Sequence, residues 1–318
     1  MGIDVNFNWS GTIVKVILGA TKSNGGTRRH SYQIGGGTTL PFLETTLGSS
    51  SPLIAFEICD DPQNWSPIVK NYCRDVVNDC GEWAHATDSV YGADIIRLYL
   101  TSTRQRNFSD IASIGKTVES VLSKTSLPLI IEGSNEPTID SEVFLKCGEA
   151  GEGEHLLLGT AEAGRYRSIA AAAMAYNHSV IAQSPIDVNL AKQLNILLKE
   201  IGVARDHIVI DPYTGSLGYG FEYSYSAVER IRFAALKGDA DLAMPIICSA
   251  IDSLTVKEVR DAEPAIQDDI AVQWEFTTGL AAAAAGAEII CVRHPRTIPL
   301  LRKAFASLKS KKIVAGGQ

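Results

Sequence analysis

Short apolar runs alternate along the chain with longer stretches in which apolar residues recur every three or four positions. Residues 53–59 (LIAFEIC) are rich in apolar and β-branched side chains, too short for a helix core, and bounded by Ser-Pro and Asp-Asp-Pro. They therefore predict a buried strand. Similar runs follow at 94–100, 127–133, 155–160, 179–183, 207–211, 244–249 and 288–293. The pattern predicts eight strands.

Helices with recognisable ends separate these strands. The clearest helices and the glycines that end them are 82–91 with Gly92, 188–201 with Gly202, and 227–237 with Gly238. Ser226 and Glu229 have capping-box spacing at the start of the third helix. Strands that are apolar throughout are buried on both faces, and here a helix follows each one. This pattern predicts an α/β protein with a parallel (β/α)₈ TIM barrel, and a doubly wound open sheet is the alternative.

The first 51 residues do not follow this repeat. Apolar runs at 12–18 and 30–34 flank an Asn-Gly-Gly sequence, which is a hairpin signal. We expect a β-hairpin extension over residues 1–51 that packs on the barrel and closes its N-terminal end. The barrel is expected at 52–308, followed by a flexible tail at 309–318.

Composition limits the classes of partner. The chain has 318 residues, is 45% hydrophobic and 20% charged, and carries a formal net charge of −7, so it offers no broad basic surface for nucleic acid or anionic membranes. The longest run without charged residues, 168–186, includes Asn, His, Gln and Pro, which is too polar for a membrane span. The first residues of the chain lack a basic region followed by an apolar one, so we expect a cytoplasmic protein.

The cysteines are scattered and form no CxxC, CxxxC or CxxxxC pair. Local ligands for an iron–sulfur cluster or a structural zinc ion are therefore missing from the pattern. We expect Cys59, Cys248 and Cys291, which lie in or beside apolar strands, to be small buried hydrophobic residues.

In barrel enzymes the chemistry lies where the strands end. No lysine occurs at these positions, which excludes a Schiff-base aldolase. The histidines form no HxH or HExxH motif, so a three-histidine zinc site is unsupported. The polar residues at the predicted strand ends are Glu57, Asp60, Thr101, Glu132, Ser134, Asn135, Thr160, Glu162, Gln183, Ser184, Asp187, Asp211, Tyr213, Thr214, Ser249, Arg293 and His294.

The densest feature is the segment 211–223 (DPYTGSLGYGFEY), directly after the sixth predicted strand. Its glycines allow close backbone approach to a ligand, and Tyr213, Tyr219 and Phe221 offer flat apolar surface. A large planar ligand with polar edges fits this composition. The alternative is a tight loop whose aromatic residues cap the barrel.

Two further strand ends allow two interpretations each. Asp187 is well placed as the N-cap of the following helix, whether or not it also faces a ligand. Arg293 and His294 are suited to an anionic or amide edge, but Arg293 could equally pair with a neighbouring carboxylate.

Several segments together resemble the small (delta) subunit of the corrinoid iron–sulfur protein of the carbon monoxide dehydrogenase/acetyl-CoA synthase system. The resemblance runs from about residue 12 to 308, and the long block at 207–239 is its most specific part. The segments are VILGATKSNGGTRRHS (16–31), LLLGTAE (156–162), IAQSPIDVNLAKQLNIL (181–197), HIVIDPYTGSLGYGFEYSYSAVERIRFAALKGD (207–239), MPIIC (244–248) and CVRHP (291–295).

This resemblance implies a barrel subunit, without catalytic side chains of its own, that pairs with a larger subunit as a heterodimer. In that family the larger subunit carries a [4Fe–4S] cluster and a corrinoid (cobamide), which the barrel mouth of the small subunit covers. The cobalt receives a methyl group from a methylated pterin, through a separate methyltransferase, and passes it to acetyl-CoA synthase in the reductive acetyl-CoA pathway.

This chain lacks the DxHxxG pattern with which many cobamide proteins replace the lower base by histidine, so we do not expect it to hold a corrinoid alone. From their positions, the residues expected to face corrinoid and partner are Ser184, Asp187, Tyr213, Thr214, Gly215, Gly218, Tyr219, Arg293 and His294.

A second hypothesis is a pterin-dependent methyltransferase that acts on its own barrel. Asp211, Glu132 and Asn135 at the strand ends could hydrogen-bond a pterin and assist protonation of its leaving nitrogen. A barrel lyase or isomerase of another kind is the third and weakest hypothesis.

Overall fold

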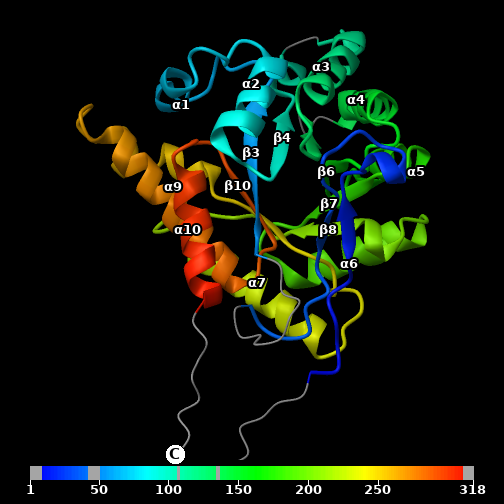
Figure 1. Cartoon of the computed structure of the whole chain (residues 1–318). Coiled ribbons are helices and arrows are strands. Elements are labelled where there is room, and N and C mark those ends of the chain that lie inside the picture. The colour runs from blue at the N-terminus through cyan, green and yellow to red at the C-terminus, as the bar shows by residue number, and fades with distance from the viewer. Residues whose placement is uncertain (1–8, 42–50, 106–107, 134–136, 311–318) are drawn as a thin grey trace, which may run out of the picture.

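The computed structural model describes residues 9–41, 51–105, 108–133 and 137–310. Its centre is a ring of parallel strands surrounded by helices (Figure 1). The strands of this ring are β3 (Leu53–Cys59), β4 (Ile95–Tyr99), β5 (Leu129–Glu132), β6 (Leu157–Ala161), β7 (Ser179–Gln183), β8 (Ile208–Asp211), β9 (Ile247–Ser249) and β10 (Ile289–Val292). All eight runs predicted as strands are therefore confirmed.

Helices connect the successive strands and pack on the outside of the ring. The α-helices are α1 (Pro67–Tyr72), α2 (Cys80–Ala86), α3 (Ile111–Lys124), α4 (Pro137–Ala150), α5 (Tyr166–Ala175), α6 (Val188–Glu200), α7 (Phe221–Leu236), α8 (Lys257–Arg260), α9 (Gln267–Ala285) and α10 (Thr297–Ser310). The short helical turns are η1 (Lys22–Asn24), η2 (Thr87–Tyr91), η3 (Thr101–Arg104), η4 (Arg205–His207) and η5 (Ile251–Thr255). The predicted tail at 309–318 lies mostly outside the described residues, and the domain boundaries stay a prediction.

The ring closes between β8 and β9. The sheet order is β8-β7-β6-β5-β4-β3-β10-β9, and every neighbouring pair is parallel. The two edge strands meet through a parallel bridge between Ile210 and Ile246, where the Ile210 amide donates to the Pro245 carbonyl at 2.8 Å. The predicted barrel is confirmed, and the open sheet is the wrong alternative.

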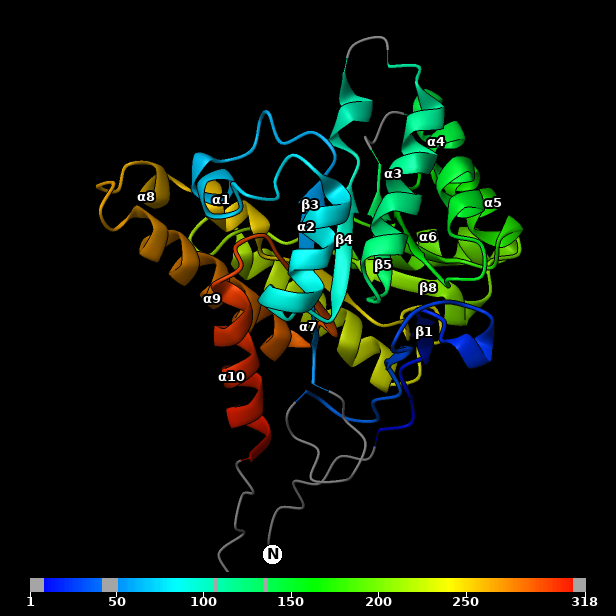
Figure 2. The same cartoon turned by 45° about the horizontal axis from the view of Figure 1, so that its top comes forward.

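The N-terminal extension forms the predicted antiparallel pair, β1 (Val16–Leu18) with β2 (Tyr32–Ile34). Its connection is longer than a tight hairpin turn: it contains η1 and then Gly25 with φ of 89°. Figure 2 shows β1 on the opposite side of the barrel from α1 and α8, the helices that follow β3 and β9. We call this side the bottom, and the end where the strands finish the mouth.

The bottom of the barrel is filled by apolar side chains. Val16, Leu18 and Ile34 of the extension belong to one buried cluster with residues from the strands. This cluster removes apolar surface from water at the point where the strands begin, so the extension stabilises the barrel. The strand residues in the cluster are Ala55, Ile95, Ile130, Leu157, Ile181, Val209, Ile247, Ile289 and Cys291.

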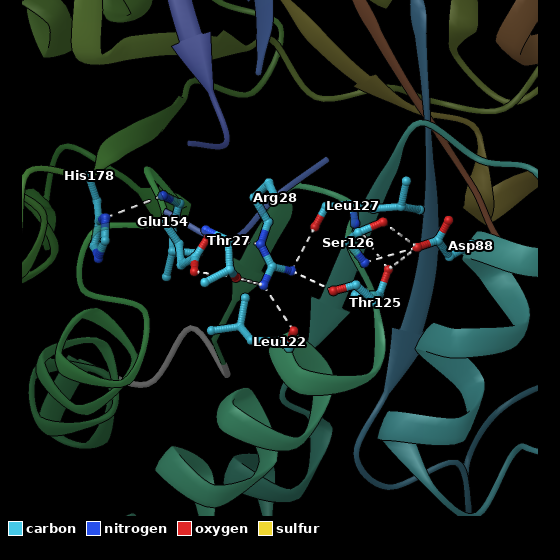
Figure 3. Close-up of polar contacts among 10 residues, drawn as sticks. Thr27, Arg28, Asp88, Leu122, Thr125, Ser126, Leu127, Glu154 and His178 are labelled. Atoms are coloured by element: carbon cyan, nitrogen blue, oxygen red, sulfur yellow. Dashed lines mark hydrogen bonds and ion pairs between the residues drawn. The ribbon is translucent and has the colours of Figure 1, made fainter. Parts of the chain in front are cut away.

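Arg28, in the connection between β1 and β2, locks the extension to the loops beneath the barrel (Figure 3). Its Nε donates to Glu154 Oε2 at 2.8 Å, and its two Nη atoms donate to the carbonyl groups of Leu122, Thr125 and Leu127 at 2.8–3.2 Å. Arg28 is only 4% exposed. Every polar group in this arrangement is paired, which is the condition for burying charge without a large cost.

Asp88 makes a second lock beside the first (Figure 3). Its carboxylate accepts hydrogen bonds from the Ser126 amide and hydroxyl, both at 2.9 Å, and from the Thr125 hydroxyl at 3.1 Å. Burial alone would raise the pKa of Asp88, but these donors and Arg29 hold it below its usual value. The bottom is thus closed by apolar packing and by fully paired polar groups.

Helix α7 begins earlier than the sequence predicts. It starts at Phe221 instead of Ala227, after Gly220 with φ of 96°. Phe221, Ser224 and Val228 lie on its buried face, so the helical periodicity already covers the aromatic segment. The predicted capping box is wrong because Ser226 lies inside the helix. The expected ends of the helices before Gly92 and Gly202 are confirmed, with a π-helical last turn in the first case.

Candidate functional site at the barrel mouth

Four charged side chains form the inner surface of the mouth, which we call the mouth floor: Glu57, Arg97, Glu132 and Arg293. Arg97 Nη1 lies 2.7 Å from Glu57 Oε2, and its Nε donates to Glu132 Oε2 at 3.0 Å. Arg293 Nε donates to the other Glu57 oxygen at 2.9 Å. At most 14% of any of these side chains is exposed. The floor is a continuous chain of alternating charges that fills the mouth from inside.

Sequence reasoning missed Arg97. It lies in the middle of β4, in the run DIIRLYL, which the sequence pattern predicts as an apolar strand. A charged residue inside an otherwise apolar buried strand was the available signal, because such a residue requires partners on other strands. The prediction that Arg293 could pair with a carboxylate is confirmed, and the partner is Glu57.

Asp211 ends β8 beside the floor. Its Oδ2 accepts from Gln183 Nε2 and its Oδ1 from the Tyr213 amide, both at 2.8 Å. Burial raises the pKa of this carboxyl above its usual value. Both oxygens are used to shape the loops around the mouth.

The loop residues 184–187 and 211–220 surround the floor, and we call them the rim. On this rim, Tyr213 and Tyr219 are 43% and 48% exposed. The Tyr219 hydroxyl donates to Glu258 Oε2 at 2.7 Å, and its ring lies edge-on to Trp274 with centroids 6.4 Å apart. Gly218, beside it, has φ of 72°, which a side chain rarely adopts. Near this edge a groove of about 280 Å³ is lined by Leu217, Ile270, Gln273, Trp274 and Thr277.

Other predicted site residues support the rim from below. Thr214 is buried, and its Oγ1 accepts from the Ser249 amide at 3.1 Å. The Gly215 amide donates to Ser224 Oγ at 2.9 Å. These contacts tie the segment 211–220 to β9 and to α7.

Ser184 and Asp187 belong to the loop between β7 and α6. Ser184 is fully buried, and its hydroxyl has no hydrogen-bond partner among the described residues. Asp187 is confirmed as the N-cap of α6, since its Oδ1 accepts from the amides of Asn189 and Leu190 at 2.8 and 3.0 Å.

Arg293 and His294 point in different directions. The Arg293 guanidinium lies over the Trp65 ring, 4.0 Å from its centroid, and reaches the floor. His294 is fully buried beside α9: its Nε2 lies 2.9 Å from Asp268 Oδ1, and its Nδ1 accepts from the Arg296 amide at 3.2 Å. Successive residues at a strand end face opposite sides, so only one of these two could face the mouth.

Glu275 of α9 fixes the turn that carries both residues. It accepts hydrogen bonds from the Arg293 amide at 2.6 Å, the His294 amide at 3.1 Å and the Thr297 hydroxyl at 2.6 Å. Burial raises its pKa to about 7. No local sequence pattern indicates a role for Glu275, because it acts on this turn from α9, outside the ring of strands.

In the described part of the chain, no group of three or more His, Cys, Asp or Glu residues is arranged so that it could hold a metal ion. Cys59, Cys248 and Cys291 are buried, as predicted. Asn135 lies outside the described residues. No described helix is long and apolar enough to cross a membrane.

Comparison with known proteins places the chain in a family. The model of the CO dehydrogenase/acetyl-CoA synthase delta subunit family matches residues 15–284. The chain belongs to this family. The delta subunit of the acetyl-CoA decarbonylase/synthase complex of Archaeoglobus fulgidus is 35% identical in an alignment that covers 97% of this chain and 71% of that protein. The same subunit of Methanothermobacter thermautotrophicus is 35% identical, over 93% of this chain and 76% of that protein.

The fold of this delta-subunit family member is also that of dihydropteroate synthases. The enzyme of Coxiella burnetii superposes with a TM-score of 0.59 at 14% identity, over 93% of this chain and 100% of that chain. The Xanthomonas albilineans enzyme has a TM-score of 0.59 at 14% identity, over 83% of this chain and 96% of that one. Identities this low support the shared barrel architecture alone.

Proposed function

We propose that this chain is the small subunit of a heterodimeric corrinoid iron–sulfur protein within an acetyl-CoA decarbonylase/synthase complex. The pair carries a methyl group from a methyl-tetrahydropterin, through a separate methyltransferase, to acetyl-CoA synthase. The larger subunit holds the corrinoid and the [4Fe–4S] cluster, and the barrel mouth of this chain covers the corrinoid. The observation that carries the proposal is the exposed aromatic rim at the mouth of a chain from this family.

The residues at the mouth fit a corrinoid lying across the rim. A corrinoid is a broad, flat macrocycle whose edge bears methyl and amide groups. The half-exposed rings of Tyr213 and Tyr219 offer flat apolar faces, and the nearby groove adds apolar surface. Because buried ion pairs fill the floor, a large ligand would rest on the rim without entering the barrel.

When bound, the corrinoid supplies a cobalt centre that can accept and release a methyl group. This chain's own residues bind and shield it. The rim tyrosines exclude water from the covered face. Arg293 is held by Glu57 and by the Trp65 ring, so the carboxylate of Glu57 balances its positive charge within the floor.

Co-expression with the larger subunit tests this function. We expect a heterodimer that survives gel filtration and whose visible spectrum contains corrinoid absorption. A stable monomer that ignores the larger subunit would overturn the proposal.

Pterin binding on the chain's own barrel is the second candidate. Its support is the fold shared with dihydropteroate synthases, one of which was solved with pteroic acid, together with the buried carboxylates at the mouth. Against it, Asp211 and Glu132 already accept hydrogen bonds from the protein. Titration of the isolated chain with methyl-tetrahydrofolate separates the two: micromolar binding, with methyl transfer to free cobamide, would favour the pterin function.

A further inference from the structure

Four residues other than glycine have positive φ in the part of the chain that the structure describes: His155 (49°), Asn177 (56°), Ile186 (58°) and Tyr213 (62°). His155 and Asn177 lie at the bottom of the barrel, just before β6 and β7. Ile186 and Tyr213 lie at the mouth, just after β7 and β8. The two ends of the barrel therefore use this unusual backbone conformation with different residue types.

Only the mouth residues are strained by it. Asparagine and histidine enter the left-handed region several-fold more often than other side chains. A β-branched residue such as Ile186 or a bulky one such as Tyr213 is an outlier there. Both follow proline, as Pro185-Ile186 and Pro212-Tyr213. In a turn with proline followed by positive φ, the second position is normally glycine or asparagine.

Hydrogen bonds between the two loops hold both residues in place. The Ser184 amide donates to the Asp211 carbonyl and the Ile186 amide to the Pro212 carbonyl, each at 2.9 Å. The Tyr213 amide donates to Asp211 Oδ1. Ile186 and Tyr213 therefore stand on backbones joined directly to each other.

Core packing does not account for the strain, because 38% of Ile186 and 43% of Tyr213 stay exposed. Glycine or asparagine would suit both turns better, and polar residues would suit the exposure better. Such outliers persist where the surroundings over-determine them, and they concentrate at ligand contacts.

We propose that Ile186 and Tyr213 form a preorganised apolar pair that contacts the corrinoid presented by the larger subunit, with Ile186 as a contact residue of the rim. The inference rests on the function proposed above. The methyl-bearing edge of a corrinoid is the apolar surface that such a pair would meet, and the locked loops remove the cost of ordering the pair on binding.

Replacement of Ile186 separates a contact from a structural role, because the two predict opposite effects. Ile186→Gly removes the backbone strain together with the apolar side chain, and Ile186→Asn retains a side chain that tolerates positive φ but is polar. If Ile186 served the fold, both variants would lower the melting temperature of the full chain. We expect an unchanged or higher melting temperature.

The decisive readout is corrinoid retention by the co-expressed heterodimer, measured as visible absorbance per protein after gel filtration and as the rate of corrinoid loss on dilution. We expect both Ile186 variants to assemble normally and to lose corrinoid about tenfold faster. Asn177→Gly is the matched control, since it makes the same kind of backbone change at the bottom, and its corrinoid retention should equal that of the unsubstituted protein.

The outcomes distinguish this inference from the proposed function. A heterodimer of the unsubstituted chain that holds no corrinoid would overturn both. Corrinoid held by that heterodimer, with unchanged retention in both Ile186 variants, would overturn the contact alone. Failure of the variants to assemble with the larger subunit would assign the pair to the protein interface, and would also overturn the corrinoid contact.

Discussion

The two ends of the barrel satisfy different requirements. At the bottom, apolar residues of the extension join those of the strands, and Arg28 pairs with Glu154 and backbone carbonyls. At the mouth, paired charged residues fill the interior, and tyrosine rings on the rim are half-exposed. Ile186 and Tyr213 have a backbone conformation that suits neither residue type.

This difference follows the division of labour known for TIM barrels, in which the end where strands begin serves stability and the end where they finish serves function. Here the two ends of the barrel differ in how their features affect the energy of the folded chain. The bottom contains features that lower the energy of the folded chain, whereas the mouth contains features that raise it. We therefore expect substitutions at the two ends to separate stability from ligand binding.

The largest effect on stability is expected from Arg28→Met. It leaves the buried Glu154 carboxylate without its ion pair and three carbonyl groups without their donor, so the free energy of unfolding should fall by about 3–5 kcal/mol. Urea unfolding measures it. Arg29→Met is the control: its partner is Asp88, but 56% of the Arg29 side chain is exposed, so the loss should stay below about 1 kcal/mol. Equal losses would contradict the assignment of Arg28 as the lock.

Leu18→Ala tests the apolar part of the bottom. Leu18 is 2% exposed in the cluster that closes the barrel, and its truncation should cost about 3 kcal/mol in unfolding free energy. The neighbouring Ile17 faces the other way and is 40% exposed, so Ile17→Ala should cost less than about 1 kcal/mol. If both variants unfold at the same urea concentration, the extension does not close the barrel as described.

Glu275→Gln tests the support of the mouth through pH. The pKa of Glu275 is raised from 4.5 to about 7 in the folded chain, so the folded state holds this proton more tightly than the unfolded state does. The stabilisation that the bound proton gives to the folded chain is therefore complete below pH 4.5 and is lost as the pH rises to about 7. Glutamine does not titrate. Relative to the variant, the unfolding free energy of the unsubstituted chain should fall by about 2–3 kcal/mol as the pH rises through this window. A constant difference between pH 5 and pH 8 would refute the raised pKa.

Tyr219→Ala should have the smallest effect on stability and the clearest effect on ligand binding. The ring is half-exposed, so the unfolding free energy should change by less than about 1 kcal/mol, while the heterodimer should retain less corrinoid. Tyr219→Phe removes only the hydrogen bond to Glu258 and should retain corrinoid normally. Gly218→Val is a poorer probe, because the positive φ of Gly218 strains any side chain placed there.

Most of the fold could be predicted because the signals are local. Each strand is a short apolar run between turn residues, and the helices before Gly92 and Gly202 end at glycines with positive φ. The start of α7 could not be predicted in this way, because glycines and tyrosines before Phe221 have the composition of a loop. What decides the helix start there is packing of Phe221 and Ser224 against the barrel.

The candidate site was harder to predict than the fold, because it depends on contacts between distant residues. The strand-end rule located Glu57, Glu132, Tyr213 and Arg293, but not Arg97, whose partners lie on other strands. Glu275 acts through backbone amides of a loop 18 residues further along the chain, which leaves no local pattern. The conformation of Ile186 contradicts its own residue preference, so no propensity could have indicated it.

The closure of the ring has a consequence for the mouth. Hydrogen-bonded strand pairing runs without a break from β8 round to β9, and the two remaining edges meet at a clasp, the single bridge between Ile210 and Ile246. The rim segment 211–220 leaves from one side of this clasp and η5 from the other. Above it, the hydrogen bond from the Ser249 amide to Thr214 acts as a second fastening. The spacing between these two parts of the mouth is therefore held by fewer backbone contacts than the spacing of any other two neighbouring strands in the ring.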